Sequence, residues 1–313
     1  MTNSPLAKCP VVVGPVSVDV LYRDVASTGG KEVYLQFGGV CHNITCTLAA
    51  HGLSPVFMSP RFSGDIGECL PGHLSARGVR WSPTKDDVPL SLFTANIGPT
   101  GSVSNELFID GGAARVLDAA TFRQSYGVFR QASAIVSCSD LSLNALEELA
   151  EISRLHDVPF CLVSTSVEEV KKIRLKRKAD IVSLNIKELN TLFAINDTEL
   201  SAIARNAVTL VSDNGACIVT LGEMGSLICT PYENEFIYQS VPLVDAKSTV
   251  GAGDALFAIV LADRLLGSSW ADAIHHAAGI VCSFIQADPQ VRNQQSQHCE
   301  KPYSVAPYER LPL

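Results

Sequence analysis

The chain has 313 residues, of which 47% are hydrophobic and 18% are charged, and its formal net charge is −8. This length and composition predict one large globular α/β domain, residues 1–313, and exclude a fibrous or disordered chain. The negative charge argues against a nucleic-acid backbone as the main partner, because such binding usually shows as a surplus of Lys and Arg. The sequence has no run of about 18 apolar residues and no leader with a basic region followed by an apolar one, so we expect a cytoplasmic protein without a membrane partner.

The first third of the chain predicts a buried strand, a helix and a second strand. Residues 9–14 are a short β-branched run that stops at Gly14, which is typical of a buried strand, and Asp19 follows its carboxyl end. Residues 40–51 are predicted as a helix that ends before a glycine, and residues 55–59 as the next strand.

Two segments interrupt this alternation. Residues 88–110 alternate in hydrophobicity on both sides of a Gly/Pro turn, which predicts a hairpin. The polar segment 22–37 is expected to accompany it. We predict that these parts of the chain, about 20–37 and 88–112, form a small lid over a ligand.

From residue 132 on, apolar runs and amphipathic segments alternate regularly. Strands are expected at 134–138, 159–163, 179–184 and 216–222, and helices at 143–156, 187–194 and 198–211. Such alternation predicts a mostly parallel central sheet flanked by helices on both faces, with ligands bound outside the carboxyl ends of the strands. Residues 288–313 are rich in Gln, Pro and Asn and are expected to be irregular surface chain.

The strongest chemical signal is the sequence Gly251-Ala252-Gly253-Asp254, which opens a long apolar stretch. Small residues at a helix start leave several backbone N–H groups free to bind phosphate. A carboxylate beside such an anion hole is useful if it takes a proton from a hydroxyl that attacks a phosphoryl group. The alternative is that Asp254 is merely the N-cap of a core helix.

Gly38-Gly39 with Asn43 one helical turn later is a second candidate site. Paired glycines permit close approach of a ligand, and an amide side chain offers both a donor and an acceptor to hydroxyl groups. The alternative is a helix start with a polar residue facing solvent.

Two further segments lie just past predicted strands. Asn185 and Glu188 share a helix face, and the Glu can hold magnesium through water, although the pair also fits a plain capping box. Residues 220–225, with Thr220, Gly222 and Gly225, can line a nucleotide or form a simple turn.

Taken together, these segments resemble the ribokinase-like (PfkB) family of sugar and nucleoside kinases in order and spacing. The motifs that carry the resemblance are Gly14 with Asp19, Gly38-Gly39 with Asn43, Gly64-Asp65 with Gly67, Asn185 with Glu188, Thr220 with Gly225, and Gly251 to Asp254. The resemblance spans nearly the whole chain. It implies a ribokinase-like α/β fold with a small β-sheet lid, and it allows a homodimer formed through that lid.

The resemblance also implies a role for each motif. Asp254 would be the catalytic base, with Gly251, Ala252 and Gly253 as the anion hole. Acceptor binding is expected from Ser17, Asp19, Gly38, Gly39 and Asn43. ATP binding is expected from Asn185, Thr220, Gly222, Gly225 and Gly253. Glu188 would hold Mg²⁺ through water.

Within the family, pseudouridine kinases are the closest likeness, on the Gly-Gly-Val start of the second motif and the Val-Ser-Cys-Ser-Asp strand end. We therefore expect ATP-dependent transfer to the 5′-hydroxyl of pseudouridine. Alternatives are a ribokinase- or fructokinase-type sugar kinase and a non-catalytic relative that binds a sugar or nucleoside. A dinucleotide oxidoreductase is disfavoured, because Gly14-Pro15-Val16 does not supply Gly-x-Gly-x-x-Gly.

The chain departs from the family pattern at two places. Ser248-Thr249-Val250 stands where many relatives carry Asp-Thr-Thr, which puts in doubt a monovalent-cation site formed by that loop. His42 is bulkier than the residue expected there, and its role stays open, as does that of residues 287–293.

Overall fold

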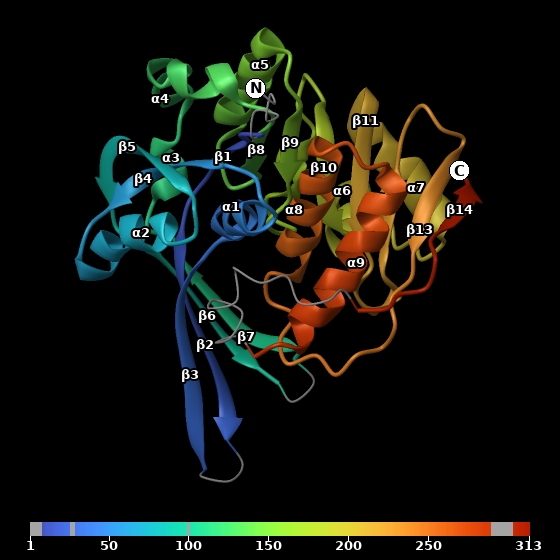
Figure 1. The fold of residues 1–313 in the computed structure, drawn as a ribbon, viewed down its shortest axis with the longest axis horizontal. Helices are drawn as coiled ribbons and strands as arrows, with labels where there is room; N and C mark the ends of the chain where they lie inside the picture. The colour runs from blue at the N-terminus through green and yellow to red at the C-terminus, as the bar shows by residue number, and fades with distance from the viewer. Residues whose placement is uncertain (1–7, 26–28, 99–100, 289–302) are drawn as a thin grey trace, which may run out of the picture.

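The computed structural model describes residues 8–25, 29–98, 101–288 and 303–313 (Figure 1). Its main body is built on a ten-stranded sheet with the order β14-β13-β12-β11-β10-β9-β8-β1-β4-β5. The pairs from β11 to β5 are parallel, and the three pairs from β11 to β14 are antiparallel. The strands are β1 (Val11–Val13), β4 (Val56–Phe62), β5 (Arg80–Val88), β8 (Ile135–Cys138), β9 (Phe160–Val163), β10 (Ala179–Asn185), β11 (Val211–Thr220), β12 (Ser226–Cys229), β13 (Glu235–Gln239) and β14 (Glu309–Pro312).

Helices cover both faces of this sheet, as expected for a parallel sheet whose strands are buried on both sides. One buried apolar cluster joins the sheet to α1, α2, α8 and α9, and the other joins it to α4, α5, α6 and α7. Helix α8 is buried on nearly all sides because it lies between the sheet and its neighbours α1 and α9. The α-helices are α1 (Val40–Ala50), α2 (Asp65–Ser75), α3 (Ala113–Val116), α4 (Ala119–Gln124), α5 (Leu143–His156), α6 (Ile186–Phe193), α7 (Leu200–Ala207), α8 (Ala252–Leu265) and α9 (Trp270–Gln286).

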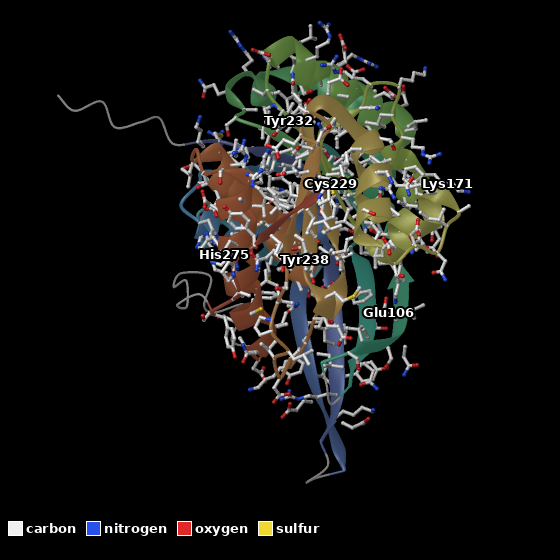
Figure 2. All side chains as sticks on the ribbon, turned by 90° about the vertical axis from the view of Figure 1, so that its right-hand side faces the viewer. Glu106, Lys171, Cys229, Tyr232, Tyr238 and His275 are labelled. Carbon is white, nitrogen blue, oxygen red and sulfur yellow. The ribbon has the colours of Figure 1, made fainter. Side chains whose placement is uncertain are left out.

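A separate four-stranded sheet extends from the main body (Figure 1). Its order is β3-β2-β6-β7, with strands β2 (Ser17–Val25), β3 (Gly30–Gly38), β6 (Ser91–Ile97) and β7 (Val103–Ile109). Strand β2 leaves the carboxyl end of β1 after a short turn, which places the start of the small sheet beside the expected ligand edge of the large one. Figure 2 shows Glu106 on this small sheet and Cys229 inside the large one.

The predicted ribokinase-like α/β class, with a mostly parallel sheet and a separate small sheet, is therefore confirmed. Two details were wrong. The predicted irregular tail contains β14, whose backbone pairs with β13, and the part of the tail at 289–302 lies outside the described residues. The single helix predicted over 198–211 stops at Ala207 and is followed by a short 3₁₀ turn, Val208–Leu210.

Within the described ranges, no helix is long and apolar enough to cross a membrane. The described cysteines are all free thiols, and six of them are buried, where a thiol packs as a small apolar side chain.

Candidate active site

Asp254 lies in the first turn of α8, at the edge where the large and small sheets meet. The N-cap of α8 is Gly251, which adopts the left-handed conformation (φ 76°), so the alternative that Asp254 itself caps the helix is wrong. Gly253 is exposed, and a Cβ atom there would meet nothing within 4 Å. The Ala252 N–H donates to the Thr249 carbonyl at 3.1 Å, whereas the N–H groups of Gly253 and Asp254 lie in the first turn, where a helix leaves donors without an intrahelical acceptor.

Asn43 on α1 holds the Asp254 carboxylate. Its Nδ2 donates a hydrogen bond to Asp254 Oδ2 at 2.8 Å. Burial raises the pKa of Asp254 from 3.8 to about 7, with the Asn43 bond acting in the opposite direction and the charges of nearby carboxylates raising it further. A carboxylate that titrates near neutrality is well matched to the work of a general base.

Asp19 faces Asp254 from the small sheet. Its Oδ1 accepts a hydrogen bond from Ser17 Oγ at 2.7 Å, and burial raises its pKa to about 6. Gly38 makes this packing possible, because a Cβ atom there would lie 2.0 Å from Asp19 Oδ2. Gly39 (φ 94°) continues the close approach, since a Cβ there would be 3.3 Å from the Ser17 nitrogen. Ser17, Asp19, Gly38 and Gly39, predicted together from sequence, are thus brought together.

Asn185 and Thr220 are register partners on β10 and β11, so they lie side by side at the carboxyl edge of the sheet. Asn185 and Glu188 form a complete capping box, with Glu188 Oε2 accepting from the Asn185 N–H at 2.8 Å and Asn185 Oδ1 accepting from the Glu188 N–H at 2.9 Å. Glu188 is buried, which raises its pKa, and its charge acts on Asp254. The capping interpretation is confirmed; a role in magnesium binding stays a prediction.

Residues 220–225 form the tight turn that joins β11 to the antiparallel β12. Leu221 N–H donates to the Gly225 carbonyl at 2.8 Å, and a Cβ at Gly225 would lie 2.0 Å from the Gln239 carbonyl oxygen. Gly225 (φ 103°) is therefore required by the turn itself. Its contact with a nucleotide, like that of Thr220 and Gly222, stays a prediction.

The loop before α8 joins the site to the small sheet. Thr249 N–H donates to the Gly101 carbonyl at 3.2 Å, and Val250 packs against the apolar cluster of Leu21, Tyr34, Ala95 and Ile97. The doubt about a monovalent-cation site at this loop stays a prediction.

Comparison with known proteins agrees with this geometry. The family described as "pfkB family carbohydrate kinase" matches residues 11–287, which is most of the chain. The chain belongs to the pfkB family of carbohydrate kinases. It is accordingly a phosphotransferase with an alcohol group as acceptor.

Individual relatives are distant. Guanosine-inosine kinase from Exiguobacterium acetylicum is 22% identical over 284 residues, covering 84% of this chain and 89% of that protein. The structure of ribokinase from Giardia lamblia superposes with a TM-score of 0.77 at 16% identity, covering 93% of this chain and 98% of the other. Arabidopsis thaliana ribokinase complexed with ribose and ATP superposes with a TM-score of 0.71 at 18% identity, covering 93% and 99%. At identities this low, the superpositions show that the chain shares the fold of these structures, but they do not identify its acceptor.

Sequence reasoning did not single out four residues that the structure places near these groups of the pfkB site. His73 and Arg77 lie behind Asn43 and are reached only through the packing of α2 on α1. Phe93 and Phe108 join the face of Asp19 only through the register of the small sheet. The His42 departure was the one sequence signal that pointed toward the first pair.

Proposed function

We propose that this pfkB-family kinase transfers the γ-phosphoryl group of ATP to the 5′-hydroxyl of a nucleoside, with pseudouridine as the first acceptor to test. The observation that carries the proposal is the Asn43–Asp254 pair at the first turn of α8, opposite Asp19. It supplies a base titrating near neutrality beside the N-terminal end of a helix and a polar wall for a sugar.

In the proposed reaction, the acceptor oxygen attacks the γ-phosphorus while its proton passes to Asp254. The bond from that phosphorus to the β–γ bridging oxygen breaks, and ADP leaves. The free N–H groups at the start of α8, next to Gly253, stabilise the charge on the phosphoryl oxygens; the Ala252 N–H, which donates to Thr249, would have to exchange that partner to take part. Ser17 and Gly39 belong to the surface that orients the sugar.

A base-binding surface lies beside the sugar wall. Asp19, Phe93 and Phe108 are paired across β2, β6 and β7, so their side chains project to the same face of the small sheet. Phe93 is half-buried and Phe108 is 57% exposed. The Phe108 ring is therefore accessible to a ligand in the same row as the Asp19 carboxylate. A free sugar has no ring to stack there, whereas a nucleobase has. The name of the relative from Exiguobacterium acetylicum, a guanosine-inosine kinase, supports the same acceptor class.

The residues at the carboxyl edge fit magnesium bound with ATP. The carboxylates of the buried Glu188 and the half-buried Asp140 act electrostatically on Asp254, and oxygen ligands of this kind suit that ion. When bound, Mg²⁺ would neutralise the phosphate oxygens. Asn185, Thr220, Gly222 and Gly225 would lie along the nucleotide, with Glu188 holding the ion through water.

We infer that residues 1–313 form one kinase domain and that the small sheet is the lid over its acceptor site. Its outer face exposes Val33, Leu35, Leu107 and Ile109, at 57%, 63%, 54% and 51%. A second copy of the chain packed on this face would bury these side chains, as in the proposed homodimer.

The test is ATP consumption against pseudouridine, uridine, adenosine, guanosine, inosine, ribose and fructose. We expect turnover with a nucleoside, and Phe108→Ala should raise KM for that nucleoside about tenfold or more, as expected for a lost stacking contact. Ribose serves as the internal control, because its KM should not change, and Phe108→Tyr should restore nucleoside binding. Turnover with ribose or fructose alone would establish the sugar-kinase alternative, and no turnover with any acceptor would favour a binding protein.

A further inference from the structure

A chain of polar side chains runs from the surface to the back of Asn43. Arg77 lies just past the C-terminal end of α2, His73 lies in the last turn of that helix, and His42 is buried on α1. Arg77 Nη1 is 3.1 Å from His73 Nδ1, and the Nε2 atoms of His73 and His42 are 3.0 Å apart. His42 Nδ1 is 3.3 Å from Asn43 Oδ1. The chain therefore continues through Asn43 to Asp254.

The direction of every hydrogen bond in this chain follows from its first member. A guanidinium can only donate, so His73 Nδ1 must be the acceptor and its proton must be on Nε2. His73 Nε2–H then donates to His42 Nε2, which leaves the proton of His42 on Nδ1. His42 Nδ1–H in turn donates to Asn43 Oδ1, so the amide must present its Nδ2 to Asp254.

Both imidazoles are neutral, as this pattern requires. Burial lowers the pKa of His42 to about 4. Burial lowers the pKa of His73 to about 3, and the positive charge of Arg77 acts in the same direction. A cationic His73 would also turn an N–H toward the Arg77 guanidinium. Phe37, at the end of β3, packs edge-on against His73 with ring centroids 4.8 Å apart, which fixes the ring plane.

We propose that Arg77, His73 and His42 form a positioning relay, which keeps the N–H of Asn43 directed at Asp254 and so keeps the catalytic carboxylate ionised. The proposal rests on the proposed role of Asp254 as base. Without the donor at Arg77, the chain can run the other way. Protonated Asp254 would then donate to Asn43 Oδ1, and the relay would stabilise the inactive acid.

The charged groups around Asp254 give the relay its importance. Asp19 from β2, Glu188 from α6 and Asp140 after β8 all carry negative charge that favours protonation of Asp254. Asn43 is the neighbour that favours the ionised form by hydrogen bonding. A relay that fixes the orientation of this one amide therefore controls the fraction of ionised base near neutral pH.

A metal ion is the competing interpretation of the same cluster. His42, His73 and Cys46 place their ligand atoms within 4.8 Å of one another, with Cys46 Sγ 3.5 Å from His42 Nε2. Coordination through Nε2 would require the proton of His73 on Nδ1, directly against the donor of Arg77. Burial also raises the pKa of the Cys46 thiol to about 12, against formation of a thiolate ligand. The relay is thus favoured.

The test is the acid limb of the pH profile of kcat/KM in matched variants of His73. His73→Leu breaks the relay and should move the acid limb to a higher pH by about one unit. At pH values below the limb, kcat/KM should therefore fall about tenfold, whereas at high pH it should equal that of the wild type. His73→Gln can accept from Arg77 and donate to His42, so the wild-type limb should return. Arg77→Met should resemble His73→Leu. An equal loss at every pH in His73→Leu, or a limb that stays in place, would overturn the relay.

A ¹³C titration of the Asp254 carboxyl group in the full chain reads the same shift without turnover. A shifted titration in His73→Leu supports the relay even if no acceptor is phosphorylated, so the relay and the proposed function can fail separately. Cys46→Ala is the control for the metal: we expect no shift and no tight binding of Zn²⁺ by the wild type. Tight Zn²⁺ binding that is lost in both Cys46→Ala and His73→Leu would contradict the relay and establish the metal site.

Discussion

Replacing Asp254 by Asn should stabilise the protein while removing its base. The pKa of Asp254 is raised from 3.8 to about 7, so the folded state holds its proton more tightly than the unfolded chain does. The free energy of unfolding therefore falls as pH rises from about 4 to about 7, because the buried carboxylate must ionise. A pKa shift of about three units corresponds to about 4 kcal/mol of unfolding free energy. This value is an upper limit, because the Asp254 side chain is partly accessible to solvent.

Urea unfolding at two pH values measures this effect. Asp254→Asn removes the cost of ionising a buried carboxylate. Its free energy of unfolding should therefore exceed that of the wild type by about 2 kcal/mol at pH 5 and by up to about 4 kcal/mol at pH 8. Asp118→Asn is the control, because the N-cap bond from Thr121 lowers the pKa of Asp118 and gives no such gain. A gain equal at both pH values, or a loss at pH 8, would refute the reasoning about burial.

Two further substitutions test the acceptor and metal sides of the site. Gly38→Ala brings a Cβ to 2.0 Å from Asp19 Oδ2 and so displaces the carboxylate. The KM for the acceptor should rise tenfold or more, while the KM for ATP should stay within about twofold. An unchanged KM for the acceptor would show that Asp19 is not part of the acceptor site. Glu188→Gln can keep the capping box, so Tm should be nearly unchanged. Because the carboxylate is lost, half-maximal activity should require a higher concentration of Mg²⁺. An unchanged Mg²⁺ titration would show that Glu188 acts only as a cap.

The sequence was sufficient for features that depend on local pattern. The buried run at Val11–Val13, the helix at Leu143–His156 and the glycine-led start of α8 follow from periodicity and from the conformations open to glycine. The grouping of Asp19 with Gly38 also came from the order of motifs, and the structure adds the reason, which is that no side chain fits beside the carboxylate.

Features that depend on long-range packing could not be predicted. His73 reaches His42 across 31 residues because α2 packs beside α1, and no local pattern states which ring nitrogens will meet. The alignment of Phe108 with Asp19 depends on two strand registers, either of which reverses the face if it shifts by one residue. The end of the chain pairs as β14 through its backbone, which composition does not reveal.

Single-turnover transfer from γ-labelled ATP to a nucleoside is the most direct test of Asp254 as the base. If Asp254 is the base, Asp254→Asn should slow transfer by about 10²–10⁴-fold, while the dissociation constant for ATP should change by less than about threefold. Transfer by Asp254→Asn at a near-normal rate, with ATP bound equally well, would contradict the account.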